Sequence, residues 1–275
     1  QPFDQLDITN TFVIYTLGVR QPVYRTLSTE IALELIGERL SSDTTLLGED
    51  FSLSPGANNG KSVDTAIRFV QEVVHRTRNL VLSARSRLSF GVDALGATTH
   101  SGDEPDGLFF AWLGQFQWVQ RLPILDAYTI ARADVQLSDR PLLVQEQVSV
   151  GGRYTVRGYR ENTLVRDNAF VASAELRVPV VQRTRWADYL ELAAFYDYGR
   201  GWNVNPPNPS PIDISSIGVG LRWALTVPAG RFSVRPQFEV YWGHALRNVS
   251  NPGTGTAGGT IQDQGVHFQF LVAIQ

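Results

Sequence analysis

The sequence contains no cysteine, and its charges almost balance. Without cysteine, the chain has neither a disulfide framework nor a thiolate metal site. The 24 Lys and Arg residues face 27 Asp and Glu residues, for a net charge of -3. Binding to phosphate backbones requires a basic surface, which this balance gives no reason to expect. We therefore expect no nucleic-acid partner.

Long hydrophobic runs are also missing. No stretch approaches the roughly 18 consecutive apolar residues of a transmembrane helix, so such a helix is excluded. The first ten residues, QPFDQLDITN, lack the basic and then apolar run of a signal peptide, so export would require that such a segment has been removed. The mean hydropathy of -0.11 suits a soluble protein or a transmembrane β-barrel, in which polar and apolar faces cancel.

Periodicity distinguishes these two classes. Across residues 80–93, apolar side chains such as Leu82 and Phe90 share one parity, and polar ones such as Arg85 and Asp93 occupy the other. Period two sustained over such a length exceeds the five or six residues of an ordinary strand. Strands that cross a membrane need roughly nine to eleven residues. The pattern therefore favours membrane-spanning strands.

The same alternation recurs along the chain, at residues 30–38, 67–73, 110–118, 131–137, 170–178, 216–223, 232–242 and 266–274. We count six strands before residues 148–168 and five after them. We predict an all-β fold, an antiparallel transmembrane β-barrel in which about eleven or twelve strands are readable. Residues 1–275 would form this single domain. A soluble β-sandwich or lipocalin-like barrel is the alternative, and strand length and one-sided charge disfavour it.

Connections between the predicted strands alternate in length, as in outer-membrane barrels. Short ones fall at residues 20–25, 76–79, 121–126, 181–185 and 227–231, and long ones at 41–60, 96–107, 138–168, 203–213 and 247–264. The face opposite the apolar one carries both signs of charge and should line a wet lumen. Its members are Glu34, Arg68, Arg85, Arg87, Arg132, Asp134, Glu175, Arg177, Arg222, Arg235 and Glu239.

Catalytic and cofactor chemistry finds little support. The four histidines (His75, His100, His244 and His267) form no i, i+4 pair, and no Ser, His and Asp set or nucleophile elbow stands out. Gly253, Gly255 and Gly258 match a dinucleotide fingerprint, but that motif needs a preceding strand and a following helix, and here a strand follows. We expect no catalytic residue, no metal, no cofactor and no enzyme activity.

Residues 148–168 are the exception among the loops. They hold a Gly-Gly pair and three arginines within eight residues (Arg153, Arg157 and Arg160), and the tip reads Val156, Arg157, Gly158 and Tyr159. A guanidinium pairs bidentately with a carboxylate. Asp197 is the candidate partner, because its parity predicts that it faces the lumen. If the loop folds inward, the two form a partly buried pair, and losing one partner costs roughly 3–5 kcal/mol.

At these residues the chain resembles the two-partner secretion transporters of the TpsB class, within the superfamily that also holds the BamA-type assembly factors. The tip from Val156 to Tyr159 is similar to the family's VRGY/F loop motif. Phe195, Asp197 and Gly199 match its inward-facing F-x-D-x-G strand motif. The resemblance implies that Arg157 and Asp197 lock the loop inside the barrel.

The resemblance also implies a function and partners. Such transporters are outer-membrane pores that secrete a large partner exoprotein, so exoprotein, outer-membrane lipid and the barrel-assembly machinery are the implied partners. The family barrel has roughly sixteen strands, which implies that this chain is a C-terminal portion without the first five strands and the POTRA domains. An assembly or insertase factor and a passive porin-like barrel are the alternatives.

Overall fold

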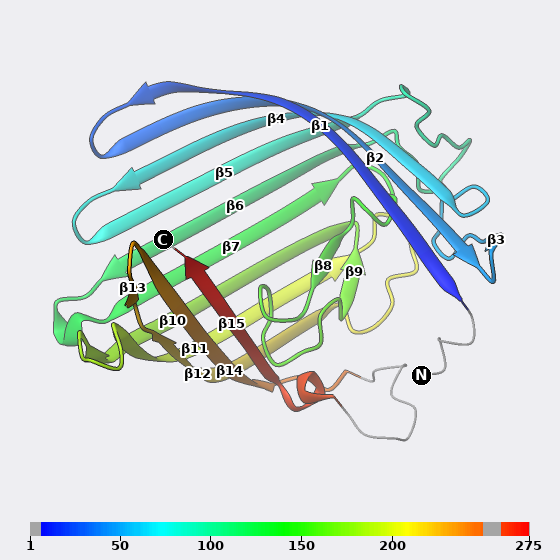
Figure 1. Cartoon of the computed structure of the whole chain (residues 1–275). Coiled ribbons are helices and arrows are strands. Elements are labelled where there is room, and N and C mark those ends of the chain that lie inside the picture. Colours follow the sequence, from blue (N-terminus) through cyan, green and yellow to red (C-terminus); the bar gives the residue numbers. More distant parts are fainter. Residues whose placement is uncertain (1–6, 250–259, 275) are drawn as a thin grey trace.

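The computed structural model describes residues 7–249 and 260–274. The glycine-rich dinucleotide fingerprint at residues 253–258 lies outside the described residues. An antiparallel sheet dominates the fold (Figure 1), and each long strand pairs with its neighbours in sequence. The strands before the long loop are β1 (Ile8–Arg25), β2 (Thr29–Leu46), β4 (Lys61–Arg76), β5 (Leu80–Gly91), β6 (Phe110–Arg121) and β7 (Tyr128–Ser138).

After the loop come β10 (Asn168–Gln182), β11 (Tyr189–Trp202), β12 (Asp213–Ala224), β14 (Phe232–Ala245) and β15 (Val266–Ile274). Six long strands before the loop and five after it confirm the predicted count. Two short strands, β3 (Glu49–Asp50) and β13 (Val227–Ala229), complete a 13-stranded sheet. A separate hairpin within the long loop joins β8 (Val148–Val150) to β9 (Leu164–Arg166).

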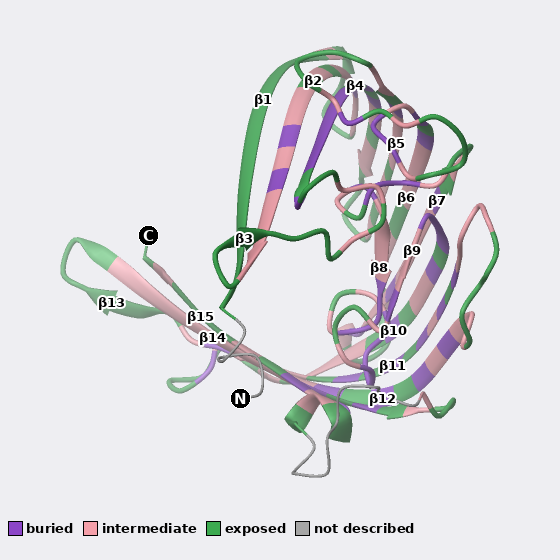
Figure 2. Cartoon of the chain, turned by 90° about the vertical axis from the view of Figure 1, so that its right-hand side faces the viewer, coloured by how far each residue is buried: buried purple, intermediate pink, exposed green. Residues whose placement is uncertain are grey.

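The sheet curls, and the β8–β9 hairpin lies on its concave side (Figure 2). In the part of the chain that the structure describes, β1 pairs only with β2 along its length, β15 pairs only with β14, and the two do not pair with each other. Among these residues no helix is long and apolar enough to cross a membrane. The helices found are single 3-10 turns, η1 (Ile124–Asp126) and η2 (Ile261–Gln264).

Burial is reversed relative to a protein with an apolar interior. Large apolar side chains such as Phe116 and Ile217 are exposed on the convex face, at 42% and 53%. Charged side chains such as Arg68 and Asp197 are buried on the concave face. Apolar groups directed outward and polar groups directed inward are the arrangement of a transmembrane barrel. The alternation in the sequence therefore assigned the two faces correctly.

The main apolar cluster lies between the loop and the sheet. Loop residues Val150, Val156, Tyr159 and Leu164 pack on strand residues Ala169, Val171 and Ile214. Two predicted connections were placed too early. Residues 20–25 continue β1, so that turn occupies residues 26–28, and β2 extends to Leu46 before its loop begins. In both places the cross-strand pairing continues through polar residues, which the apolar pattern did not reveal.

Candidate functional site

The long loop between β7 and β10 folds back against the inner face of the sheet and brings Arg157 to Asp197. The Arg157 Nε donates to Asp197 Oδ2 at 2.8 Å, and Nη2 donates to Oδ1 at 2.9 Å. The Arg157 backbone N–H also donates to Oδ2, at 3.0 Å. The pair is therefore bidentate, as the geometry of a guanidinium and a carboxylate favours. Both side chains are buried.

A second carboxylate and a hydroxyl complete the surroundings of this cation. Arg157 Nη1 donates to Glu175, and Nη2 lies 3.3 Å from the Ser173 hydroxyl. Ser173 in turn donates to Asp197 Oδ1 at 2.6 Å. Burial by itself lowers the pKa of Arg157, but the hydrogen bonds and charges of Asp197 and Glu175 outweigh it, so the pKa lies above its ordinary value. The arginine therefore stays charged and paired.

Aromatic rings form the floor under the guanidinium. Its carbon lies 3.5 Å from the centroid of the Phe195 ring and 4.9 Å from that of Tyr241. The two rings meet edge to face at 6.0 Å. A guanidinium stacks well on an aromatic face, and such contacts gain strength away from water. This contact gives the phenylalanine of the F-x-D-x-G motif a physical role.

Strand register explains why these residues meet. Ser173 pairs with Asp197, and Glu175 pairs with Phe195, across β10 and β11. On the other side, Phe195 lies opposite Gly218 of β12. Alternate residues of a strand point to one face, so these side chains all face the loop. Two residues on one strand and two on its neighbour thereby surround a single guanidinium.

Glycines on the same face provide room for the loop. A Cβ at Gly199 would lie 2.4 Å from Val150 Cγ1 and 2.8 Å from Val156 Cγ2. At Gly243, a Cβ would lie 2.7 Å from the backbone nitrogen of Gly158. These distances are far below van der Waals contact, so the loop docks where the wall has no side chains. The glycine of the F-x-D-x-G motif thus accommodates the two valines of the loop.

The loop tip is held through its backbone and its tyrosine. Gly158 has a φ of 91°, which a residue with a side chain rarely adopts, and its N–H donates to His267 Nε2 at 3.2 Å. The Tyr159 hydroxyl donates to the Ser215 carbonyl at 2.8 Å and accepts the N–H of Arg247 at 3.1 Å. These contacts reach β15 at His267, β12 at Ser215 and, at Arg247, the segment that follows β14.

Further ion pairs hold the loop at its sides. Arg153 donates to Glu239 of β14 at 2.6 Å, and Arg160 donates to Asp263 of η2 through two nitrogens. The hydrogen bonds from Arg160 hold the pKa of Asp263 at about 2, well below its usual range. The same pairing raises the pKa of Arg160.

The other predicted lumen residues face the interior as a charged network. Arg68 contacts Glu38 and Glu146, and Arg85 lies 3.3 Å from Glu72. Arg177 pairs with Glu175, and Arg222 bridges Glu191 and Glu239. Within the described residues, five of the predicted set lie in no ion pair: Glu34, Arg87, Arg132, Asp134 and Arg235.

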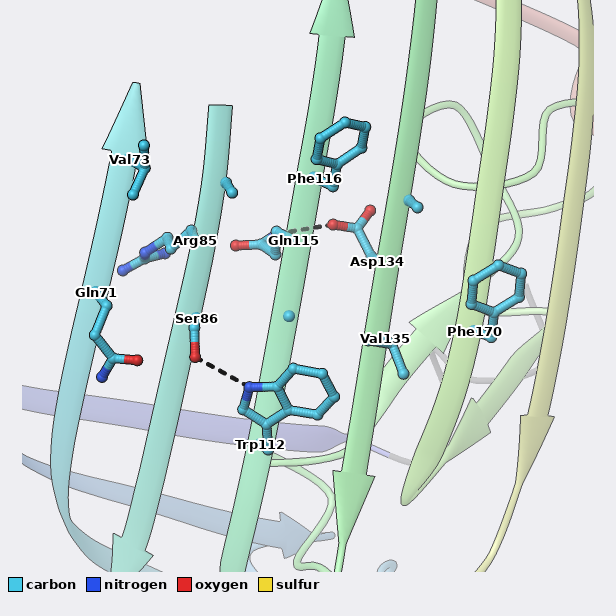
Figure 3. Close-up of a pocket in the computed structure, with 13 residues that line it drawn as sticks. Gln71, Val73, Arg85, Ser86, Trp112, Gln115, Phe116, Asp134, Val135 and Phe170 are labelled. Atoms are coloured by element: carbon cyan, nitrogen blue, oxygen red, sulfur yellow. Dashed lines mark hydrogen bonds between the residues drawn. The ribbon is translucent and has the colours of Figure 1, made fainter. Parts of the chain in front are cut away.

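Asp134 also lies on the inner face, where it accepts a hydrogen bond from Gln115 at 3.1 Å (Figure 3). Phe116, which follows Gln115 in β6, belongs to the opposite face and lies beside a depression of about 400 Å³. There the Trp112 indole N–H donates to Ser86 Oγ at 3.1 Å, also drawn in Figure 3. The alternation of two faces along a single strand is visible at these residues.

Sequence reasoning found Arg157 and Asp197 but missed several of their neighbours. Ser173, Tyr241, Gly218 and Gly243 were not singled out, and Glu175 was predicted as a lumen residue only. All of them have inward parity. For Ser173, Gly218 and Gly243, the small residue at an inward position was the signal that the sequence offered. Within the described residues, no group of three His, Cys, Asp or Glu side chains is arranged to hold a metal ion.

Comparisons with known proteins agree with this geometry. The family model described as haemolysin secretion/activation protein ShlB/FhaC/HecB matches residues 16–223. No curated protein matches the sequence in a direct search. Among solved structures, CdiB from Escherichia coli is similar with a TM-score of 0.71 at 18% identity, over 98% of this chain and 46% of that one.

Two further structures are similar. CdiB from Acinetobacter baumannii gives a TM-score of 0.66 at 14% identity, covering 96% of this chain and 42% of that one. BamA from Haemophilus ducreyi lacking POTRA domains 1-3 gives 0.62 at 12% identity, covering 98% and 55%. The chain thus spans about half the length of these structures, and at such identities the likeness shows the β-barrel fold. Because the family model covers most of the sequence, the chain belongs to the ShlB/FhaC/HecB family of two-partner secretion transporters.

Proposed function

We propose that this chain contributes the wall and the gating loop of an outer-membrane pore through which a large partner exoprotein is secreted. Family membership and the barrel fold support this proposal. The protein acts as a conduit and not as a catalyst. Outer-membrane lipid would contact the convex face, which the exposed apolar side chains there support. The barrel-assembly machinery is the proposed partner for insertion.

The observation that carries the proposal is the bidentate contact of Arg157 with Asp197, which holds the loop against the concave face of the sheet. A loop held in this way obstructs the path of an exoprotein. Passage therefore requires that the loop leaves the wall or shifts along it. The cost of leaving is set by the buried pair, because an uncompensated buried charge costs roughly 3–5 kcal/mol.

The mixed charge of the inner face suits passage of an extended polypeptide. Acidic and basic side chains pair with each other on neighbouring strands, as Arg222 does with Glu239 at 2.8 Å. Four of the predicted lumen arginines are already paired with carboxylates, so a passing segment meets neutralised side chains at these positions. A wet wall of this kind lowers the risk that one segment of the exoprotein binds and stays.

A reversible cross-link tests whether the loop must move. An ideal Cβ at Gly199 lies 3.8 Å from the Val150 Cβ, which is the typical Cβ separation of a disulfide. The Val150→Cys/Gly199→Cys pair joins the hairpin to β11 in a chain that has no other cysteine. Only the Val156 Cγ2 methyl, 2.8 Å from the new Cβ, must shift.

We expect cells that express the protein with its exoprotein to stop secreting when the cross-link is oxidised and to resume after reduction. The Val150→Cys single variant is the matched control and should secrete under both conditions. Thiol labelling measures the fraction cross-linked. Undiminished secretion by a fully cross-linked protein would refute the proposed movement of the loop.

The assembly-factor alternative is distinguished by the cargo. The likeness to BamA, at 12% identity, supports the shared fold only, whereas the matching family model is that of secretion proteins. If the chain served assembly, its loss would reduce the amount of other barrels in the outer membrane. Loss of a secretion pore would leave those barrels unchanged and retain one exoprotein in the periplasm.

A further inference from the structure

A second buried arginine cluster lies on the wall opposite the first, and its ligands come partly from the same loop. Arg68 of β4 donates through Nη1 to Glu146 Oε2 at 3.0 Å, and Nη2 donates to the other oxygen of that carboxylate. Glu146 belongs to the segment of the long loop that precedes β8. Both side chains are almost completely buried, at 5% and 6% exposure.

The cluster is completed by the wall itself. Arg68 Nη2 donates to Glu38 of β2 at 2.7 Å, and Nη1 donates to the Ser89 hydroxyl of β5 at 2.9 Å. One arginine is thus surrounded by two carboxylates and one serine. Arg157 has the same set in Asp197, Glu175 and Ser173.

The loop supplies a charge of opposite sign to each of the two clusters. At Arg157 the loop supplies the cation and the wall supplies the anions. At Arg68 the wall supplies the cation, and the loop supplies one of the anions, Glu146. The strands β4 and β11 are five steps apart in the sheet order, or about 24 Å at roughly 4.8 Å per strand. The loop therefore bridges two separate walls.

Packing and backbone contacts around Glu146 agree with a docked segment. Leu142 packs on Ala66, Phe109 and Ala111 of the wall. The Glu146 carbonyl accepts a hydrogen bond from Gln136 of β7 at 2.9 Å. These contacts are distinct from those of the β8–β9 hairpin, which packs on β10 and β12.

We propose that Glu146 and Arg68 form a second anchor of the loop, which holds its first part to the β2, β4 and β5 wall independently of Arg157 and Asp197. Arg68 and Glu146 are positioning residues in this view. Full release of the loop requires that both anchors open, whereas opening either one alone frees only the adjoining part of the loop.

Two buried positions, Leu143 and Val150, can report on the two anchors separately. Leu143 and Val150 are 1% and 0% exposed, and they lie on the two sides of Glu146. Because the chain has no native cysteine, Leu143→Cys or Val150→Cys provides one thiol whose maleimide labelling rate measures how often that part of the loop leaves the wall. The measurement uses the whole chain folded in lipid vesicles and does not depend on secretion.

Glu146→Gln removes the loop's charge while Arg68 keeps Glu38, so the wall remains neutralised. We expect labelling of Leu143→Cys to accelerate at least about tenfold, which corresponds to about 1.4 kcal/mol, while labelling of Val150→Cys stays unchanged. Asp197→Asn should have the opposite pattern. Glu146→Asp keeps the charge and should restore most of the protection at Leu143→Cys.

Glu161→Gln is the matched control, because Glu161 lies in the same loop, is exposed, and accepts the Arg153 N–H through an oxygen that a glutamine retains. It should change neither labelling rate. Equal labelling of Leu143→Cys with Glu146 and with Gln at that position would overturn the proposal. So would a rise at Val150→Cys as large as that at Leu143→Cys, because the loop would then leave the wall as one unit.

Discussion

The shape of the Arg157 side chain matters as much as its charge. Its guanidinium presents two parallel donors to Asp197 and a flat face to Phe195. A lysine ammonium has neither the fork nor the flat face. Residues at this site therefore act through geometry, and a substitution that conserves charge is not conservative.

Arg157→Lys tests this requirement. We expect docking of the loop to weaken by about 1.5–3 kcal/mol, the value of one hydrogen bond to a charged group, although the charge is kept. The labelling rate of a Val150→Cys reporter measures the change. Arg153→Lys in the same loop is the control, since the ion pair of Arg153 with Glu239 uses one nitrogen and can be reproduced by a lysine. Similar rates in both variants would argue against a role for the fork.

Gly218 is the second sensitive position. A Cβ there would lie 2.2 Å from the Trp242 carbonyl oxygen and 2.4 Å from the Phe195 ring. Because one neighbour is backbone of the adjacent strand, relief requires that β12 and β14 separate. We expect Gly218→Ala to destabilise the fold by about 3 kcal/mol, at the upper end of overpacking effects.

Gly37→Ala is the matched control for that change, because the nearest atom to a Cβ at Gly37 is 4.0 Å away, on another strand of the same sheet. Urea titration of the folded fraction in vesicles compares the two variants. Equal stability of both would show that the glycines on the inner face are not required for packing.

At the scale of elements, the loop depends on a short helical turn outside the sheet. In η2, Asp263 accepts the N–H of Thr260 at 2.6 Å and pairs with Arg160 of the loop. The Asp263 carboxylate thus caps the η2 turn and also binds Arg160 of the loop. Its pKa falls from the ordinary 3.8 to about 2 because of these hydrogen bonds.

The depressed pKa predicts a pH dependence with a definite sign. A carboxylate whose folded pKa lies below its unfolded value adds stability at higher pH, and this contribution is lost as the pH falls from about 4 to about 2. We expect hydrogen-exchange protection of the η2 amides, corrected for intrinsic rates, to fall across that interval. Asp263→Asn should show low protection already at pH 5, without the transition. Constant protection in the unsubstituted chain would contradict the assignment.

At the scale of the whole molecule, the two faces of the sheet differ in polarity: apolar side chains are exposed on one, and charged side chains are buried on the other. Gln115 and Phe116 are consecutive residues of β6 on opposite faces (Figure 3). The first lies beside Asp134 in the interior, and the second is exposed on the convex face. A charge therefore has a partner at one position, and under the proposed function it would meet lipid at the next.

Phe116→Arg should lower the free energy of unfolding in vesicles by up to about 2–4 kcal/mol, the cost of a cation on the lipid face of a barrel. Gln115→Arg places the same cation one residue earlier, next to Asp134, and should be tolerated. The folded fraction after urea titration measures both. A larger loss for Gln115→Arg would mean that the faces are reversed.

Much of this molecule follows from local sequence. Period-two alternation identified the long strands on both sides of the loop and the face that each residue occupies, because side-chain direction in a strand depends only on parity. The pairing of Arg157 with Asp197 also came from the sequence, through parity and the resemblance of two motifs. The role of that pair as a lock stays a prediction.

Only the tertiary structure decided which residues surround each arginine. Ser173 and Glu175 of β10 and Tyr241 of β14 come from strands far apart in sequence, and they meet because register sets which residues are opposite. The pairing of Glu146 with Arg68 likewise depends on where the loop crosses the interior. Parity is a property of one strand, whereas register and loop path result from the packing of many, so the sequence determined the faces and the fold determined the contacts.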